Sequence, residues 1–287
     1  MTIAKKTAAL LTATLLLMVA AVYAAAQLLL IESYNRLEAD DGKENVGRVQ
    51  QALTADRDAL TSLAEDWSNW NDAYQFVLDA NQEFIDANLH GQAFSKMKTD
   101  IVLFINNDGE LVNATAFDRH TKERSDPPPG FLNSFGPDSP FLRGDDKLEA
   151  ISGVLQTEAG LVEFTALPIL DSEYKGPSHG TIVFGRKLDS EVIGRISKVV
   201  RLPVSMSRVN GDPLGKIEQT ALAHLSGGEE AFVAPLSDDD LAGYGLIADV
   251  YGKPAALFQV RTPRTIHAQG EQTIRYLPSP RGSKTST

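Results

Sequence analysis

The N-terminal part of the chain contains an apolar segment that is long enough to cross a membrane. Residues Thr7 to Ile31 include no charged side chain and are rich in Leu and Ala. As an α-helix this segment would extend roughly 37 Å, which exceeds the ~30 Å hydrocarbon core of a bilayer and allows a modest tilt. The sequence therefore predicts a transmembrane helix at residues 7–31. Any folded domain must then be formed by the residues after Ile31.

The charges on either side of the apolar segment predict its orientation. Lys5 and Lys6 precede it, whereas acidic residues from Glu32 onward follow it. Because basic residues stay on the cytoplasmic side of the inner membrane, residues 1–6 are expected in the cytoplasm and the body of the protein in the periplasm or outside the cell. A cleaved signal peptide is the alternative, since Val22–Ala24 offers a small-residue cleavage site. Both interpretations place the body outside the cytoplasm.

Charge and cysteine content exclude several classes of function. The chain has 38 acidic and 27 basic residues in 287, a formal charge of −11, so an acidic surface would repel the phosphates of a nucleic acid. It contains no cysteine, which rules out disulfides, thiolate zinc sites and cysteine nucleophiles. The length is enough for one large domain or two small ones.

Beyond the apolar segment, hydrophobic residues recur at alternating steps of three and four. The positions are Val46, Val49, Leu53, Leu60, Leu63, Trp67, Trp70, Tyr74 and Val77. This spacing predicts a long helix that continues out of the membrane to about Leu78, interrupted where Asp56 occupies a seam position. The same spacing is typical of coiled coils, so we expect two such helices to pack together in a homodimer.

From Ile101 onward the hydrophobic period changes to two. Ile101–Phe117 contains two apolar runs around the turn Asn106–Gly109, which predicts a β-hairpin. The predicted fold class is α+β, with a long N-terminal membrane-anchor and spine helix followed by two lobes of antiparallel sheet. A helix is expected at residues 190–199, and further strands at residues 160–170, 180–188, 202–206, 232–235, 243–250 and 255–260.

Residue types that carry metal or catalytic chemistry form no recognisable pattern. The five histidines lie far apart in the sequence, and no P-loop, Gly-x-Ser-x-Gly or dinucleotide-binding motif is present. Ser226–Phe232 resembles the Gly-Gly-Glu-Glu-Phe loop of diguanylate cyclases, but Ala231 separates the second acid from the phenylalanine. We therefore expect no catalytic residue, no metal ion and no cofactor. An enzyme of the cell envelope is the least supported interpretation.

The segment Asp66–Phe76 concentrates aromatic, amide and carboxylate side chains and includes both tryptophans of the chain. On a helix its aromatic residues would share one face and either anchor the helix on the sheet or line a small-molecule pocket edged by polar groups. The candidate ligand-binding residues are Asp66, Trp67, Trp70, Asn71, Asp72 and Tyr74.

Several motifs, in order along the chain, resemble the fourth CHASE-type extracellular sensory domain. Its Asp…Trp-Asp-Asp…Tyr…Phe signature is matched by Asp66, Trp70, Asn71, Asp72, Tyr74 and Phe76. The resemblance continues through Phe84–Leu89, Ile101–Val112, Ala166–Leu170, His179–Asp189 and Tyr244–Arg264, and covers roughly residues 40–277. Asn71 departs from the aspartate that is common in the family, so a ligand that contacts this position would be selected differently here.

The resemblance implies a PAS/Cache-like sensory domain at residues 32–277, held at the inner membrane by a single N-terminal span. Such domains bind small molecules that are largely unknown and lie between two membrane helices of bacterial receptors. Diguanylate cyclase, phosphodiesterase or histidine-kinase output domains follow them, and a ligand is expected to shift the long helix. The alternative is a secreted periplasmic small-molecule-binding protein.

The C-terminal segment departs from that receptor architecture. Residues 271–277 are expected to form a helix leading toward a second span, and the polar residues 278–287 to be a disordered tail. Since no output domain follows, we expect either a fragment of a longer receptor or a sensor that works through a partner chain.

Overall fold

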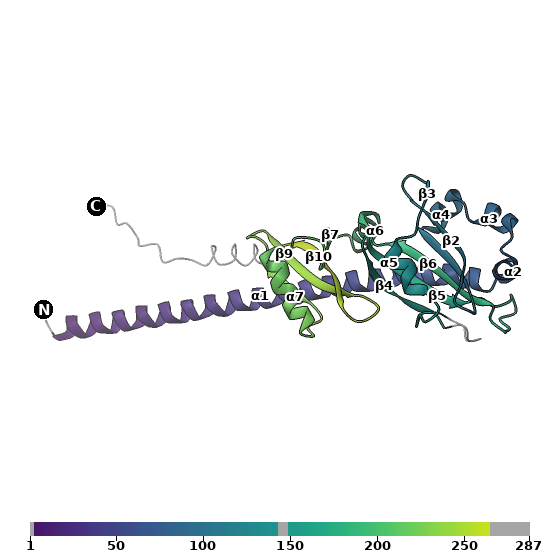
Figure 1. Cartoon of the computed structure of the whole chain (residues 1–287). Coiled ribbons are helices and arrows are strands. Elements are labelled where there is room, and N and C mark those ends of the chain that lie inside the picture. The colour runs from purple at the N-terminus through teal and green to yellow at the C-terminus, as the bar shows by residue number, and fades with distance from the viewer. Residues whose placement is uncertain (1–2, 143–148, 265–287) are drawn as a thin grey trace. The chain divides into compact units, whose positions relative to one another are not determined.

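The computed structural model describes residues 3–142 and 149–264 (Figure 1). The larger of two compact units consists of Val46–Phe232 and Tyr244–Val260, and the smaller unit contains the remaining described residues. The helix predicted at residues 271–277 and the tail predicted at residues 278–287 lie outside the described residues.

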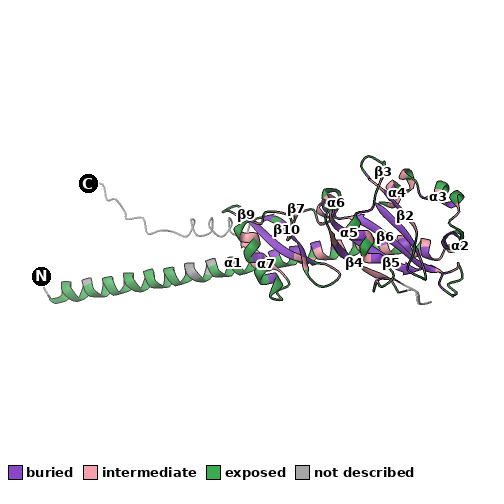
Figure 2. Ribbon diagram, in the orientation of Figure 1, coloured by how far each residue is buried: buried purple, intermediate pink, exposed green. Residues whose placement is uncertain are grey.

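Helix α1 (Ile3–Ser68) contains the predicted transmembrane segment. Its first part, Ile3–Ala26, has a mean hydropathy of 2.2 and is long and apolar enough to cross a membrane. Figure 2 shows this part of α1 exposed to the surroundings rather than packed on the protein. By length and composition this helical surface fits the hydrocarbon core of a bilayer. The predicted anchor at residues 7–31 lies within α1, and its exact membrane boundaries stay a prediction.

The prediction of one helix reaching Leu78 is wrong, because α1 ends at Ser68. The Ser68 hydroxyl and the Asn69 amide both donate to the Glu65 carbonyl, and the Ser68 carbonyl accepts from the backbone N–H of Leu170. Trp70 then adopts an extended conformation (φ −101°, ψ 124°), and a new helix, α2 (Asn71–Asp79), begins after it. Side-chain bonds to backbone carbonyls compete with the helical pattern and explain the break.

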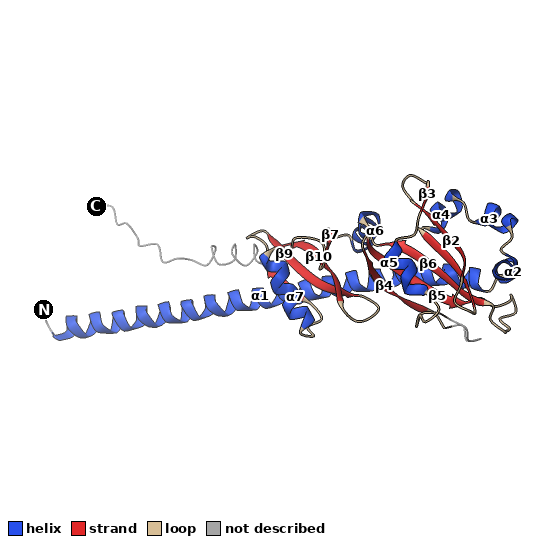
Figure 3. Cartoon of the chain, in the orientation of Figure 1, coloured by secondary structure: helices blue, strands red, loops and turns tan. Residues whose placement is uncertain are grey.

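A six-stranded antiparallel sheet forms the centre of the larger unit (Figure 3), in the order β3-β2-β1-β6-β5-β4. Its strands are β1 (Ile101–Asn106), β2 (Leu111–Phe117), β3 (Arg124–Ser125), β4 (Ile151–Thr157), β5 (Gly160–Pro168) and β6 (Gly180–Lys187). The predicted hairpin is confirmed as β1 and β2, and the predicted strands at residues 160–170 and 180–188 as β5 and β6. Strand β4 was not among the predicted strands.

Both faces of this sheet are covered. Along β1, Val102 and Phe104 point into a cluster with α1, α2 and the short helices α3 (Gln82–Asn88) and α4 (Gly91–Met97). The alternate residues Ile101, Leu103 and Ile105 point into a second cluster, with α5 (Pro129–Leu132) and the 3-10 turn η1 (Asn133–Phe135). This alternation follows from the two-residue period of a strand, and it buries β1 on both sides.

A second sheet has four strands in the order β7-β10-β9-β8. Its strands are β7 (Val204–Arg208), β8 (Phe232–Pro235), β9 (Asp240–Ala248) and β10 (Pro254–Pro263), and its helices are α6 (Ser190–Val200) and α7 (Lys216–Ser226). A third hydrophobic cluster joins α6, this sheet and the Val46, Val49 and Ala52 side chains of α1. The α+β fold class with two sheets is confirmed.

The hydrophobic stripe of α1 is covered within a single chain. Val46, Val49 and Leu60 are buried by the sheets that pack on the helix. The spacing that suggested a coiled coil is therefore accounted for by intramolecular packing, and the homodimer stays a prediction.

Gly180 and Gly194 provide a matched pair of stability tests. A Cβ atom at Gly180, which has φ +150°, would lie 2.0 Å from the Ile105 carbonyl oxygen of the neighbouring strand, whereas Gly194 in α6 has open space around it. We expect Gly180→Ala to lower the free energy of unfolding by at least about 2 kcal/mol. Gly194→Ala should raise it by about 0.5–1 kcal/mol, since alanine favours helix. Urea denaturation followed by circular dichroism measures both, and equal effects would contradict the strand register described here.

Candidate functional site

The candidate ligand-binding segment lies where α1 ends and α2 begins, and the break between these helices separates its residues. Trp67 belongs to the last turn of α1, Trp70 to the extended connection, and Tyr74 to α2. The one-face arrangement expected for a continuous helix is therefore not present. The six candidate residues instead occupy four different environments.

The two tryptophans contact each other and two phenylalanines. The Trp67 ring meets Trp70 edge to face with ring centroids 5.7 Å apart, and it meets Phe184 of the sheet at 5.6 Å. Phe84 of α3 lies 5.5 Å from Trp70 and 6.2 Å from Trp67. Both indoles are half-buried at the edge of the hydrophobic cluster. They anchor the end of α1 on the sheet and still present part of their surface to solvent.

Asn71 and Tyr74 hold the loop that connects β5 and β6, here called the β5–β6 loop (residues 171–179). The Asn71 side-chain oxygen accepts from the backbone N–H of Ser172 at 3.0 Å. The Tyr74 ring stacks on His179 with centroids 3.7 Å apart, and its hydroxyl donates to the Pro177 carbonyl at 3.2 Å. These two residues connect α2 to the sheet through the loop.

The two acids of the segment are exposed, and Asp72 lines a cavity of about 510 Å³. The cavity lies between α2 and α3 and is lined by Asp72, Gln75, Asp79, Asn81, Glu83, Phe84, Ala87 and Asn88. Its lining includes three carboxylates and no basic side chain. Hydrogen bonds from the Asn81 and Gln75 side chains lower the pKa of Asp79, so this carboxylate stays ionised. The cavity therefore favours a cation or a ligand rich in hydrogen-bond donors.

Sequence reasoning missed several residues at this site. Asp79 and Glu83 line the cavity, Phe84 adjoins both the cavity and the tryptophans, and His179 stacks on Tyr74. The resemblance of Phe84–Leu89 to the family motif was the available signal for Phe84. Among residues 3–142 and 149–264, no group of three or more histidine, aspartate or glutamate side chains is placed to hold a metal ion.

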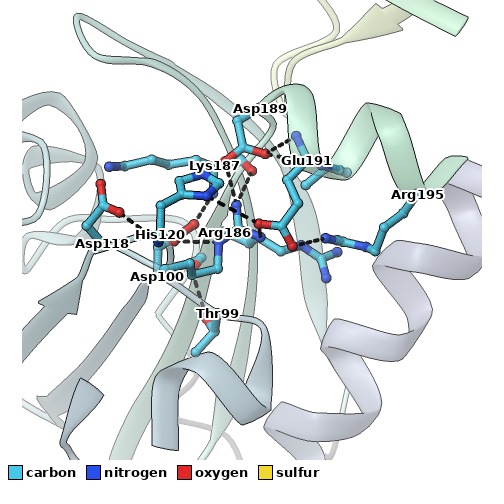
Figure 4. A network of polar contacts seen from close by, with 12 residues as sticks. Thr99, Asp100, Asp118, His120, Arg186, Lys187, Asp189, Glu191 and Arg195 are labelled. Carbon is cyan, nitrogen blue, oxygen red and sulfur yellow. Dashed lines mark hydrogen bonds and ion pairs between the residues drawn. The ribbon is translucent and has the colours of Figure 1, made fainter. Parts of the chain in front are cut away.

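A second polar cluster lies where the six-stranded sheet meets the start of α6 (Figure 4). The buried Arg119 guanidinium contacts Asp100 at 2.6 Å and Asp189, the N-cap of α6, at 2.7 Å. Asp100, Asp189 and Glu191 are labelled in Figure 4. Burial raises the pKa of Asp100, and Arg119 offsets this only in part. For Asp189, backbone N–H bonds from α6 and the charge of Arg119 outweigh burial and lower the pKa. The charge of Arg119 therefore compensates the burial of the Asp100 carboxylate in part.

Comparison with known proteins assigns a family to most of this fold. The CHASE4 domain family model matches residues 52–207. The methanogenesis regulatory histidine kinase FilI of Methanothrix harundinacea (strain 6Ac) is 31% identical over 226 residues. The match covers 78% of this chain, but the chain spans only 24% of the length of that curated relative.

Two solved structures share the fold at low sequence identity. The extracellular domain of vpHK1S-Z8, a protein assigned as a histidine kinase, superposes with a TM-score of 0.53 at 8% identity, covering 84% of this chain and 95% of that domain. A domain assigned to the sensory box/GGDEF family of Vibrio parahaemolyticus superposes with a TM-score of 0.51 at 8% identity, covering 83% of this chain and 99% of that domain. At these identities the likeness establishes the fold alone.

Replacing Asn71 tests its contact with the β5–β6 loop. Asn71→Ala removes the acceptor of the Ser172 N–H, so we expect amide hydrogen exchange in the loop to become about threefold to tenfold faster. Hydrogen-exchange mass spectrometry measures this change. Asp66→Ala, at an exposed position close in sequence, is the control and should leave the loop unchanged. An unchanged loop in Asn71→Ala would show that this hydrogen bond does not hold it.

Replacing Arg119 tests the buried ion pair. Arg119→Met leaves Asp100 without its partner and should cost about 3–5 kcal/mol of unfolding free energy near pH 7. Because the folded-state pKa of Asp100 is raised, the folded variant takes up a proton on acidification, and its deficit relative to the unsubstituted chain should shrink from about pH 7.5 to about pH 5. Thermal melts across this range measure the gap, with the exposed Arg124→Met as control. A gap that widens on acidification would contradict the pKa direction.

Proposed function

Because this chain belongs to the CHASE4 domain family, we propose that it is the extracytoplasmic input domain of a transmembrane signalling receptor. The observation that carries the proposal is that one continuous helix joins the apolar segment to the family-matching residues. A helix long and apolar enough to span a membrane runs without a break into the residues that match the family model. A CHASE4 sensor domain on a membrane anchor binds its ligand outside the cytoplasm, and the anchor helix can transmit the signal across the membrane.

The output pathway is proposed from the relative rather than from this chain. The matching protein of Methanothrix harundinacea is named as a regulatory histidine kinase, and most of its length lies outside the match. We therefore favour a histidine-kinase output in a two-component system over a diguanylate cyclase or phosphodiesterase output linked to cyclic di-GMP. The inner membrane is the proposed location of the anchor, with the sensory part in the periplasm or outside the cell.

The proposed ligand site is the acidic cavity together with the aromatic residues beside it. Asp72 supplies a carboxylate, and the half-buried tryptophans Trp67 and Trp70 adjoin the same Phe84 that lines the cavity. Asn71 and Tyr74 would act indirectly, by holding the β5–β6 loop beside the site. Asp66 is exposed and makes the weakest case of the six. A small cationic molecule fits the charge and size of the cavity, with no enzymatic step proposed.

The topology can be tested with single engineered thiols, because the chain has no cysteine of its own. Glu158→Cys places a thiol on the exposed turn between β4 and β5, and Lys5→Cys places one before the apolar segment. In intact cells a membrane-impermeant maleimide should label only Glu158→Cys, and Lys5→Cys should react after lysis.

Two results would redirect the interpretation. If Glu158→Cys reacts only after lysis, the extracytoplasmic location is wrong. A mature chain whose mass corresponds to a start near Ala25 would favour the secreted binding protein instead, although cleavage there would fall inside the continuous helix α1.

Tryptophan fluorescence offers a test of the ligand site, since both tryptophans of the chain contact Phe84, which lines the cavity. We expect a panel of small amines to include a compound that changes the emission and raises the melting temperature. Asp72→Asn should weaken its binding by about tenfold or more, because it removes a direct contact. Trp70→Ala should weaken it by a smaller factor, because Trp70 contacts the cavity only through Phe84. Ser205→Ala, at an exposed position on β7, is the control. Equal affinities in all variants would remove this site from consideration.

A further inference from the structure

Helix α1 joins two hydrophobic clusters, and a belt of charges separates them. Leu60 and Ala64 belong to the cluster on the six-stranded sheet, whereas Val49 and Ala52 belong to the cluster that includes the four-stranded sheet. Between Ala52 and Leu60 α1 contributes Asp56 and Arg57, and Thr61 follows Leu60 directly. All three face polar side chains of the six-stranded sheet. We call Asp56, Arg57, Glu163 and Arg186 the charge belt.

The members of the charge belt are closely paired. Arg186 of β6 contacts Asp56 at 2.6 Å and Glu163 of β5 at 2.8 Å, and Arg57 contacts the second oxygen of Glu163 at 3.1 Å. The Arg186 and Glu163 side chains are only 4% and 3% exposed. Removing one partner of a buried charge is destabilising. Arg186 and Glu163 pair with each other, and α1 adds a second acid beside Arg186 and a second base beside Glu163.

Hydroxyl groups extend the polar contact by one helical turn. The Thr61 hydroxyl of α1 lies 3.1 Å from the Ser152 hydroxyl of β4 and 3.3 Å from the Thr165 hydroxyl of β5. Ser152 and Thr165 also contact each other at 3.0 Å. The three hydroxyls form a closed set of contacts that includes one residue from the helix.

Helix α6 takes part in the same polar system. Its Arg195 contacts Asp56 of the charge belt at 3.5 Å and Glu191 of its own first turn at 3.2 Å. Figure 4 shows Glu191 reaching both Arg195 and the His120 side of the cluster. Asp189 at the start of α6 is held by Arg119 of the sheet. Charged contacts therefore connect α6 to α1 and to the six-stranded sheet.

We propose that the charge belt fixes the register of α1 on the six-stranded sheet, so that α1, this sheet and α6 move as one body. Apolar contacts alone would not fix it, because the stripe of α1 repeats every three or four residues. A slide of one turn, about 5.4 Å, would place Ala52 or Leu60 where Asp56 lies, and Leu53 or Thr61 where Arg57 lies. Either slide removes Asp56 from Arg186 and Arg57 from Glu163, so the charge belt loses two of its three ion pairs while Arg186 and Glu163 keep only each other. A response by sliding of α1 along the sheet would have to break these two ion pairs, whatever the ligand is.

Disulfide trapping in the full chain tests the register. Thr61→Cys with Ser152→Cys forms the native-register pair, because the two hydroxyl oxygens lie 3.1 Å apart. Glu65→Cys with Ser152→Cys reports a slide of one turn. With the charge belt intact, the native pair should cross-link under mild oxidation at least about tenfold more than the shifted pair.

The decisive variant replaces the belt by apolar residues of similar size: Asp56→Leu, Arg57→Met, Glu163→Met and Arg186→Met. Such replacements of buried ion networks often preserve stability, so fold and register can be separated. If this variant shows a native melting transition, we expect the shifted pair to cross-link to within about twofold of the native pair. An unchanged preference for the native pair would overturn the proposal, because packing alone would then fix the register.

A single substitution decides the question if the apolar variant does not fold. Glu163→Gln keeps the shape of the side chain and removes one belt charge, and Glu158→Gln makes the same change at an exposed position on the β4–β5 turn. Cross-linking of the shifted pair should rise at least about threefold in Glu163→Gln relative to Glu158→Gln. Equal yields in the two variants would overturn the proposal.

Discussion

The packing of α1 against the sheets is the interaction on which the larger unit depends. The described part of this helix beyond Asn45 contributes buried side chains to two hydrophobic clusters, one on the six-stranded sheet and one that includes α6 and the four-stranded sheet. Leu60 and Ala64 of α1 belong to the first cluster, and Val46, Val49 and Ala52 belong to the second. The central strand β1 is buried on both faces only because α1 to α4 cover one side while α5 and η1 cover the other. The apolar stripe of α1 therefore packs into two separate clusters at different positions along the helix.

Much of this architecture could be predicted from hydrophobic periodicity. The hairpin at Ile101–Phe117, the later strands and α6 follow local patterns that the structure confirms. The break after Ser68 could not be predicted in this way, since the stripe continues through it. The break depends on local bonds to the Glu65 carbonyl and on the N–H of Leu170, which is about a hundred residues away in sequence. Strand β4 contains Gly153 and polar alternate residues, which weaken its strand pattern.

At the candidate site too, the local sequence predicted which segment matters, and contacts with residues distant in sequence determine how it is arranged. The sequence pointed to a segment rich in aromatic and polar side chains, and the structure distributes its residues among an aromatic cluster, a loop contact and a cavity rim. For Asp56 the sequence showed the position but not the partner. Its interruption of the apolar stripe was visible in the sequence, but its partner Arg186 is 130 residues later and became identifiable only from the fold. An irregularity in a hydrophobic pattern is informative once the residue opposite it is known.

The end of α1 at Ser68 has a consequence for receptor engineering. Because the sheet sets where the helix stops, residues added or deleted before Glu38 change the phase of the apolar part of α1 and leave the buried positions Val46, Val49 and Ala52 in place. Each added residue rotates that part by about 100° and displaces it by about 1.5 Å. Fusions of this module to another anchor should therefore be built as a series of single-residue length changes, in which output that varies with helical periodicity would identify rotation as the transmitted motion.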